Sequence, residues 1–392
     1  DAAGFMDGDG RPLLRRRGVD TSPTPDVAEP RDFPARVEHW QAKMPEPGRF
    51  GRVQSSRPRF TTRLADLVAG VPPEVAEAER WELDRAADGG PGATANAHLA
   101  AVRGMGGAVD DEVRSRVRSM APELGDYPRE TVARARQVAA DAEKAWRRAD
   151  AEGSPDLAAL NAAAYQARAE ADRLSGDFAD AMIQATRDVL GEIRDMGPDG
   201  ENKLDLDGDP DAVAALRWAE QMLPTDWIGA ARRPIEARVS NGNRGSYEEH
   251  TGRIVVVDAG GEHATSVGKY ESTAIHELGH HLERAIPDLL EAQRAYYWAR
   301  TSTGEVGSRT RDGRNAAASL ADLFPGHGFT ADELARLDWW LDPYMGRDYD
   351  GDHYEILSMG LQALFAGDWY LDDDIARFLM GLVASLRAQG RI

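Results

Sequence analysis

The sequence predicts a predominantly helical α+β protein with one small sheet, and three observations lead to this fold class. Apolar residues recur at helical spacing over long stretches, above all between residues 129 and 193. One short segment, "RIVVVDA" at 253–259, is rich in β-branched residues and is typical of a strand. Hydrophobic residues make up 42% of the 392 residues, which is enough to bury at least one full core.

Residues 1–60 are expected to form a proline-rich extended arm or linker. Eight of the 21 prolines of the chain fall here, among Arg, Gly and Asp, with no sustained helical or strand period. A partner would be needed to order such an arm. Beyond it, a short helix is expected in "TTRLADLVAG" at 61–70, and residues 81–110, with "DGGPGATANAH", are expected to be rich in loops.

Residues 61–200 form the second expected region, which is dominated by two long antiparallel helices. The first runs from Arg129 to Gly153 and the second from Pro155 to about Ile193, with "EGSP" between them. Packing or spacing is the simplest role for such a hairpin. Together with the arm, it is also the candidate surface for an assembly partner.

Residues 201–392 form the third expected region, which contains the strand and most of the remaining helices. Pro287 ends one helix and opens the next, while Thr330 and Glu333 have the spacing of a capping box. The acidic stretch "DLDGDPD" lacks the Gly and Glu that an EF-hand loop would need at 210 and 216, so it is expected to be an acidic turn. Helices are expected at 211–222, 272–285, 287–300, 331–342, 354–365 and 372–388.

Charge and composition exclude several classes of function. The formal net charge of -20 opposes binding to nucleic acid and to acidic membrane surfaces. No window approaches the 18 or so apolar residues of a membrane span, and the first residues contain no apolar signal core. The absence of cysteine leaves His, Asp and Glu as metal ligands and is typical of an intracellular chain. With no signal peptide visible, delivery by a non-classical route is the alternative expectation.

The stretch "STAIHELGHHLER" at 272–284 carries the chemistry expected of the chain. His276 and His280 are four residues apart, so both imidazoles lie on one helix face and can share a metal ion. Glu277 lies about 100° around the helix, where it can reach a water at that ion without replacing it. This spacing predicts a hydrolytic metal site in which Glu277 is the general base. An amphipathic helix with incidental histidines is the simpler alternative.

Two neighbours in the same helix have open roles. His281 either contacts substrate or is a solvated helix histidine. Glu283 lies on the face of His276 and His280, where it either orients an imidazole or forms an exposed salt bridge.

"HELGH", followed later by "YEILSMG", resembles the zincin metallopeptidases, in particular the thermolysin-like gluzincins. The span from about Val189 to Leu386 also resembles metallopeptidase domains of phage- and prophage-associated proteins and of some bacterial effector proteins. The motifs that carry this wider resemblance are "RDMGPDG", "LPTDW", "HELGHHLE", "DPYMGRDY", "EILSMGLQALF" and "FLMGLV". It covers about half of the chain and says nothing of the arm or the hairpin.

The resemblance implies one zinc ion held by His276, His280 and Glu355, because the gluzincins take their third ligand from a downstream E-x-x-S or E-x-x-A helix. Glu355 and Ser358 match that pattern, although Ser358 could equally be only a helix residue. Glu355 follows His280 by 75 residues, far more than the usual thermolysin-like gap. The inserted segment would cover or shape the cleft. The rival third ligands are His327, Asp352 and His353.

A zinc peptidase also needs a donor for the developing oxyanion. Four side chains precede or adjoin Glu355 in the sequence, and Tyr349 is preferred among them over Tyr344, His353 and Tyr354. The segment 253–259 is expected to be either the sheet edge on which an extended peptide lies or simply an internal strand.

Two functions follow as expectations. The first is a zinc endopeptidase that acts on a protein or peptide substrate. The second is a structural or interaction protein of a phage particle or delivery system, in which the zincin domain is vestigial or restricted to one partner.

Overall fold

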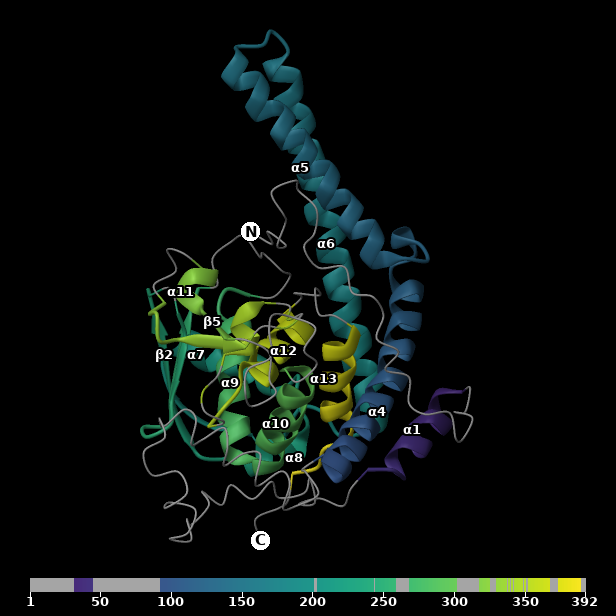
Figure 1. The fold of residues 1–392 in the computed structure, drawn as a ribbon, viewed down its shortest axis with the longest axis vertical. Coiled ribbons are helices and arrows are strands. Elements are labelled where there is room, and N and C mark those ends of the chain that lie inside the picture. The colour runs from purple at the N-terminus through teal and green to yellow at the C-terminus, as the bar shows by residue number, and fades with distance from the viewer. Residues whose placement is uncertain are drawn as a thin grey trace, which may run out of the picture.

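The computed structural model describes most of the chain from residue 92 onward, together with one short segment before it. The described residues are 32–44, 92–200, 203–242, 244–258, 268–301, 317–324, 329–336, 338, 340, 342–347, 349, 352–366 and 373–388. They form the predominantly helical α+β fold that the sequence predicts, with a small mixed sheet on one side of the body (Figure 1).

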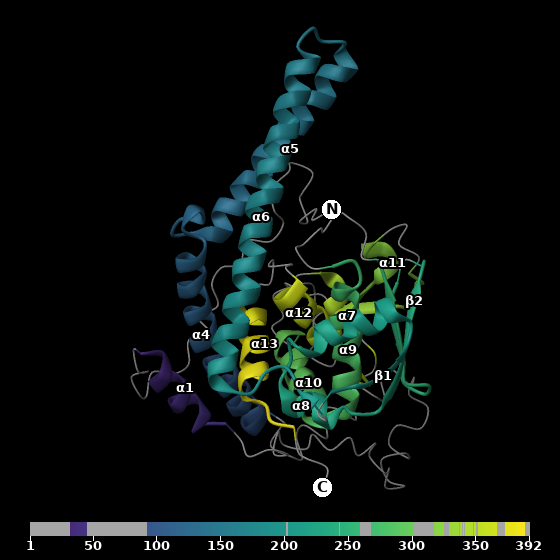
Figure 2. The ribbon, with the colours of Figure 1, turned by 180° about the vertical axis from the view of Figure 1, so that it is seen from behind.

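A hairpin of two long helices projects from the body (Figures 1 and 2). It is the predicted hairpin, and the first helix ends at Gly153, which adopts the left-handed conformation that favours glycine (φ 65°). The second helix is continuous from the tip into the body, where its second half is buried. The helices of this part are α1 (Phe33–Gln41), α4 (Gly92–Met120), α5 (Pro128–Glu152) and α6 (Leu157–Ile193), with a 3-10 turn, η1 (Pro122–Leu124).

The N-terminal part differs from the expectation in two places. Residues 33–41, inside the expected extended arm, form α1, which Asp32 caps by accepting a hydrogen bond from the Ala35 N–H. The prediction that residues 81–110 are rich in loops was wrong from Gly92 onward, because α4 begins there. Its glycines and alanines do not break the helix; they allow neighbouring helices to pack closely against it. The rest of the arm and the segment 61–70 lie outside the described residues, and the expected boundaries near 60 and 200 stay predictions.

Four strands form the sheet, in the order β1-β2-β4-β3. The first three pair in parallel, and β3 pairs antiparallel with β4, with Ser246 opposite Val255. The predicted strand is therefore internal, and β3 is the outer strand on its side, so the idea that 253–259 forms the edge was wrong. The strands are β1 (Asp205–Gly208), β2 (Pro234–Ser240), β3 (Ser246–Glu248) and β4 (Arg253–Val257).

The end of the acidic stretch 205–211 caps a helix as expected, but Asp205–Gly208 pairs with β2 as strand β1, so the expectation of a turn was wrong there. Asp209 accepts a hydrogen bond from the Asp211 N–H at 3.0 Å, and Pro210 is the first helical residue. Two helices follow β1, α7 (Pro210–Glu220) and α8 (Thr225–Ala230).

The predicted helices of the C-terminal third form, with one exception. Glu333 does accept a hydrogen bond from the Thr330 N–H, as a capping box requires, but Leu334–Arg336 then pairs with Ala317–Ser319 as a strand. The local cap signal is real, but the strand partner earlier in the chain overrides the helix. The elements are α9 (Glu271–Ala285), α10 (Pro287–Thr301), β5 (Ala317–Ser319), α11 (Leu320–Leu323), β6 (Leu334–Arg336), η4 (Pro343–Gly346), α12 (Glu355–Ala366) and α13 (Asp373–Ser385).

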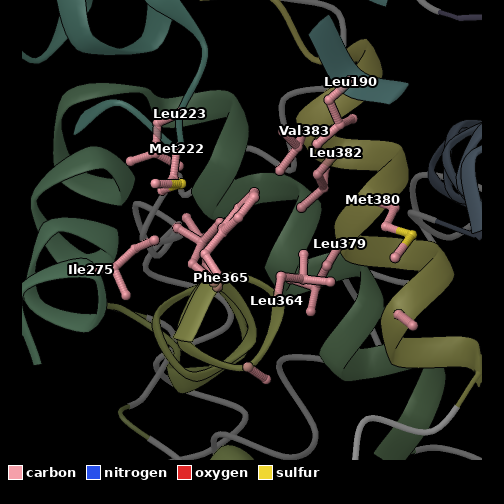
Figure 3. Packing of buried hydrophobic residues seen from close by; sticks show 14 of the residues in the cluster. Leu190, Met222, Leu223, Ile275, Leu364, Phe365, Leu379, Met380, Leu382 and Val383 are labelled. Carbon is pink, nitrogen blue, oxygen red and sulfur yellow. The ribbon is translucent and has the colours of Figure 1, made fainter. Parts of the chain in front are cut away.

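One cluster of buried apolar residues extends through the described chain from Val37 to Leu386. Its centre brings α9, α12 and α13 together, with Ile275, Phe365 and Leu379 among the packed side chains (Figure 3). The sheet and α9 lie on one side of α12, whereas α13, α4 and α6 lie on the other (Figures 1 and 2). Within the described residues, no helix has the length and apolar character to cross a membrane.

The contact between α4 and α13 depends on glycines from both helices. A Cβ built on Gly106 would collide with the backbone carbonyl of Arg377, and one on Gly381 would collide with that of Val102. Gly107, the next residue in α4, meets only the flexible side chain of Arg377, at 3.9 Å.

Gly106→Ala is therefore expected to lower the free energy of unfolding by about 1 to 3 kcal/mol, because the added methyl forces two backbones apart. Gly107→Ala is the matched control and is expected to raise it by about 0.5 to 1 kcal/mol through helix propensity. Urea unfolding followed by circular dichroism measures both. Equal effects of the two substitutions would contradict the close packing described here.

Candidate metal centre

Helix α9 places both histidines and the glutamate of "HELGH". Its apolar side, including Ile275, Leu278 and Leu282, is buried in the core. In contrast, the side chains of His276 and His280 remain partly exposed, at 17% and 14%. The two rings are 5.2 Å apart between centroids. The helix thus anchors itself through its apolar face and leaves both imidazoles accessible from one side.

Glu355 joins these histidines from the first residue of α12. Its Oε2 lies 3.4 Å from His276 Nε2 and 3.2 Å from His280 Nε2. One ligand atom from each of the three residues falls within 4.8 Å of the other two, and it is the only such group of three or more metal-ligating side chains among the described residues. This group can hold a metal ion.

The glycine of "HELGH" lets the two helices approach. A Cβ on Gly279 would lie 2.8 Å from the Cα of Ser358, so any larger residue would push α12 away from α9. Ser358 also donates a hydrogen bond to Glu355 Oε2 at 3.0 Å. The serine of "E-x-x-S" thus holds the carboxylate in place and is more than a helix residue.

Each imidazole has an outer partner. Gln362, two turns after Glu355 on α12, lies with its Oε1 3.0 Å from His276 Nδ1 and donates from Nε2 to Ser272 Oγ at 2.8 Å. Because Nδ1 of His276 faces an amide oxygen, we assign the ring proton to Nδ1. Nε2 is then free as a ligand atom.

Glu283 lies on the other side, 3.7 Å from His280 Nδ1, and it accepts a hydrogen bond from the Tyr354 N–H. It is buried, so the exposed salt-bridge alternative was wrong; it lies beside the imidazole at ion-pair distance, and among the described residues His280 Nδ1 makes no hydrogen bond.

Electrostatics within the cluster favour positive charge beside Glu355. Burial opposes ionisation of Glu355, but the neighbouring His280 and His276 outweigh it and hold the pKa of that carboxyl well below its usual range. Burial likewise lowers the pKa of His280, yet the carboxylates of Glu355 and Glu283 overcome this and raise it to about 10. The negative potential of Glu355 and Glu283, which raises the pKa of His280, also favours binding of a divalent cation.

Glu277 is 5% exposed, so its carboxylate is buried. A Cβ on Gly245, which precedes β3, would lie 2.6 Å from Glu277 Oε1, so the glycine backbone closes directly over the carboxylate. Burial raises the pKa of Glu277, while the charges of His276 and His280 act against that shift. A raised pKa suits a group that must accept and return a proton near neutral pH.

Tyr349 also reaches the centre. Its hydroxyl donates to Glu355 Oε1 at 2.5 Å and lies 3.2 Å from the hydroxyl of Tyr344. Burial and the charge of Glu355 raise the pKa of Tyr349, so it stays a protonated donor.

The other candidate residues fall into distinct places. His353 packs against Tyr349, and burial lowers its pKa to about 4. Tyr354 is buried in the core beside Tyr297, and Asp352 donates its N–H to the Tyr349 carbonyl. Neither Asp352 nor His353 belongs to the ligand group, and His327 lies outside the described residues.

His281 is buried away from the ligand cluster and lies beside Tyr247. Its Nε2 is 2.7 Å from the Ala231 carbonyl, so it is a core histidine bonded to the backbone, and the expectation of a solvated histidine was wrong.

Sequence reasoning missed four residues of this site. Two of them could have been found from helical spacing. Gln362 follows Glu355 by seven residues and Ser272 precedes His276 by four, and both spacings put the pair on one helix face. Arg244 and Gly245 precede a three-residue strand and carried no such signal; Arg244 reaches the site through Tyr344, to whose hydroxyl it donates at 2.9 Å.

No protein-family model, curated protein or solved structure matches this chain. The geometry of the residues themselves is therefore what defines the centre.

The structure predicts one strong divalent-metal site per chain, lost in His280→Ala because only two donors then remain. Gln362→Leu keeps all three donors and should weaken binding by about 10-fold to 100-fold, as loss of an outer partner does. His250→Ala, an exposed histidine in the turn before β4, is the control and should bind like the parent protein. Competition with a chromophoric chelator gives the affinities; full binding by His280→Ala would contradict the assignment.

Proposed function

We propose that this chain is a zinc-dependent endopeptidase. The observation that carries the proposal is the convergence of His276, His280 and Glu355 beside the buried carboxylate of Glu277. Two imidazoles and one carboxylate are the ligand set that catalytic zinc sites commonly use, leaving a fourth position for water or substrate.

The spacing of the donors is compatible with zinc. Ligand atoms about 2.0 to 2.1 Å from a tetrahedral centre are about 3.3 to 3.4 Å apart from one another. The separations of Glu355 Oε2 from the two imidazole nitrogens, 3.4 and 3.2 Å, agree with that edge. Cysteine is absent from the chain, so no thiolate competes for this role.

In the proposed reaction, Glu277 moves the protons. A zinc ion bound to such ligands lowers the pKa of water toward ~7 and polarises a carbonyl. The Glu277 carboxylate takes the proton of the attacking water and later delivers it to the leaving amine. Its burial under Gly245 excludes bulk water from the carboxylate, which keeps the transferred proton within the site.

Tyr349 and Tyr344 are the proposed donors to the oxyanion that forms on the substrate carbonyl. Their hydroxyls are within 3.2 Å of each other, and Tyr349 touches Glu355, so both lie at the side of the ligand cluster. Of the two, Tyr349 is closer to the ligands. Substrate arrival would require its hydroxyl to exchange Glu355 for the carbonyl oxygen.

Glu277→Gln tests the proposal, because the amide keeps the shape of the carboxylate and cannot accept the proton. Peptide cleavage is expected to fall by about 10²-fold to 10⁴-fold while zinc remains bound. The assay is hydrolysis of a quenched-fluorescent peptide library, with zinc measured by elemental analysis.

Glu271→Gln, in the first turn of the same helix, is the matched control and should cleave like the parent protein. The proposal fails if the parent chain binds no zinc, or if Glu277→Gln cleaves peptides at the parent rate.

One observation favours the second candidate, a structural or interaction protein of a phage particle or delivery system. The α5–α6 hairpin projects from the body (Figure 1) and exposes large apolar side chains, with Tyr165 at 75% and Val138 at 55%. Exposed apolar groups on a projecting hairpin lie where a partner can cover them.

Under that candidate, the chain forms a stable assembly that survives His276→Ala combined with His280→Ala. Tyr165→Glu with Val138→Glu should dissociate it, because both charges fall on the exposed hairpin. Light scattering after size-exclusion chromatography gives the mass. A monomer at all concentrations, together with cleavage of many unrelated peptides, would contradict an assembly role.

A further inference from the structure

An arginine lies beside the metal centre in a position to bind substrate. Arg244 is exposed and immediately precedes Gly245, whose backbone covers Glu277. Hydrogen bonds of 2.9, 3.2 and 2.5 Å lead from Arg244 through Tyr344 and Tyr349 to Glu355. The guanidinium is thus within three hydrogen-bond lengths of the ligand carboxylate.

Aromatic rings fix the orientation of this guanidinium. Its central carbon lies 5.1 Å from the ring centroid of Phe329 and 5.7 Å from that of Tyr344. Cation–π contact and the hydrogen bond to the Tyr344 hydroxyl together restrict a side chain that would otherwise sample many rotamers. An arginine held in this way can bind a partner with little further loss of entropy.

The neighbouring arginine is already paired, whereas Arg244 forms no ion pair with a carboxylate of the described residues, although its charge acts on Glu277 and Glu333. Arg347 also donates to the Tyr344 hydroxyl, but its NH2 forms an ion pair with Glu333 at 2.6 Å. Among the described residues, the one polar contact that the structure gives Arg244 is its single donation to Tyr344. Within the described part of the chain, most of its five N–H donors therefore have no acceptor and are available to a ligand.

From this geometry we propose that Arg244 selects substrates that carry a carboxylate one or two residues from the scissile bond. This inference rests on the proposed peptidase function and names its substrate class. The planar fork of a guanidinium matches a carboxylate with two parallel hydrogen bonds. An extended peptide advances about 3.3 Å per residue, so three hydrogen-bond lengths correspond to at most two or three residues.

The negative net charge of the chain makes a local positive group necessary for binding an acidic substrate. At -20 the protein repels acidic peptides at long range, so binding of a carboxylate requires positive charge at the site itself. Arg244 supplies it at the edge of the sheet, where it leads into β3. The carboxylate belongs either to an acidic side chain or to a free C-terminus.

The test compares matched peptides cleaved by the zinc-loaded full chain. Each pair is identical except for Glu or Gln at one of the two positions on either side of the scissile bond, with both ends blocked. A second set leaves the C-terminus free or amidates it. The Glu member of one pair, or the free C-terminus, is expected to have a kcat/KM about tenfold higher or more, as a charge-assisted hydrogen bond provides.

Substitutions at Arg244 distinguish substrate binding from a structural role. Arg244→Gln should bring the ratio of the two kcat/KM values near one, and Arg244→Glu should favour Lys over Glu at the same position. Arg238→Gln, an exposed arginine on β2, should keep the parent ratio. A role confined to holding Tyr344 would lower both kcat/KM values together and leave their ratio unchanged, which would overturn the proposal.

A binding measurement keeps this proposal separate from the peptidase proposal. Fluorescein-labelled members of the same pairs are titrated against zinc-loaded Glu277→Gln, with or without Arg244→Gln, and followed by anisotropy. A carboxylate preference that Arg244→Gln removes supports the proposal, even where no peptide is cleaved and the peptidase proposal alone has failed. Equal binding of both members, no binding, or a preference that survives Arg244→Gln overturns it.

Discussion

The close approach of α9 and α12 at Gly279 is the contact on which the rest of the centre depends. With no Cβ at this position, the backbone of Ser358 can lie against α9. That closeness brings Glu355 to the two imidazoles across 75 residues of sequence, and it places Gln362 against His276 two turns later. One helix thus supplies both the third donor and the group that orients the first. A separation of the helices by even an ångström would disturb all of these contacts at once.

The charges of the centre are suited to function more than to stability. Glu277, Glu283 and Glu355 are all buried, and removing carboxylates from water is costly unless opposite charge compensates them. The protein surrounds them with two imidazoles and hydrogen-bond donors from Ser358, Tyr349 and the backbone of Tyr354. Burial and like charge keep Tyr349 protonated, whereas its neighbour His353 stays neutral. Such contrasts between adjacent groups are common where a fold performs acid and base chemistry at one pH.

Much of this arrangement could be predicted from the sequence, because it depends on local periodicity. The apolar spacing of α9, α12 and α13 defined those helices, and the four-residue spacing of His276 and His280 put both on one face. Glu355 could be named only through the resemblance of "E-x-x-S" to known metal-binding helices, since no local rule links residues so far apart.

The failures share a physical cause, which is that neighbours distant in sequence decided the outcome. Helix α4 was missed because its glycines read as loop signals, when in fact they admit the carbonyl of Arg377 and its neighbours. The segment after Glu333 kept its cap yet became a strand, because Ala317–Ser319 offered a partner. The order of the strands, which makes β3 the outer one, is equally a property of the assembled sheet.

The unbroken course of α6 has a mechanical consequence. Hairpin and body are joined through α6 and also through η1 and the base of α5, where Arg129 pairs with Asp373 of α13. Ser175 donates its hydroxyl to the Ala171 carbonyl, and Gly176 follows with open space around it, a pairing at which helices commonly bend. The helix from Leu157 to this point is about 28 Å long, so a bend of about 10° would swing the tip by about 5 Å. The hairpin is therefore expected to bend at Ser175 and Gly176, so that its tip moves while the packed second half of α6 stays fixed.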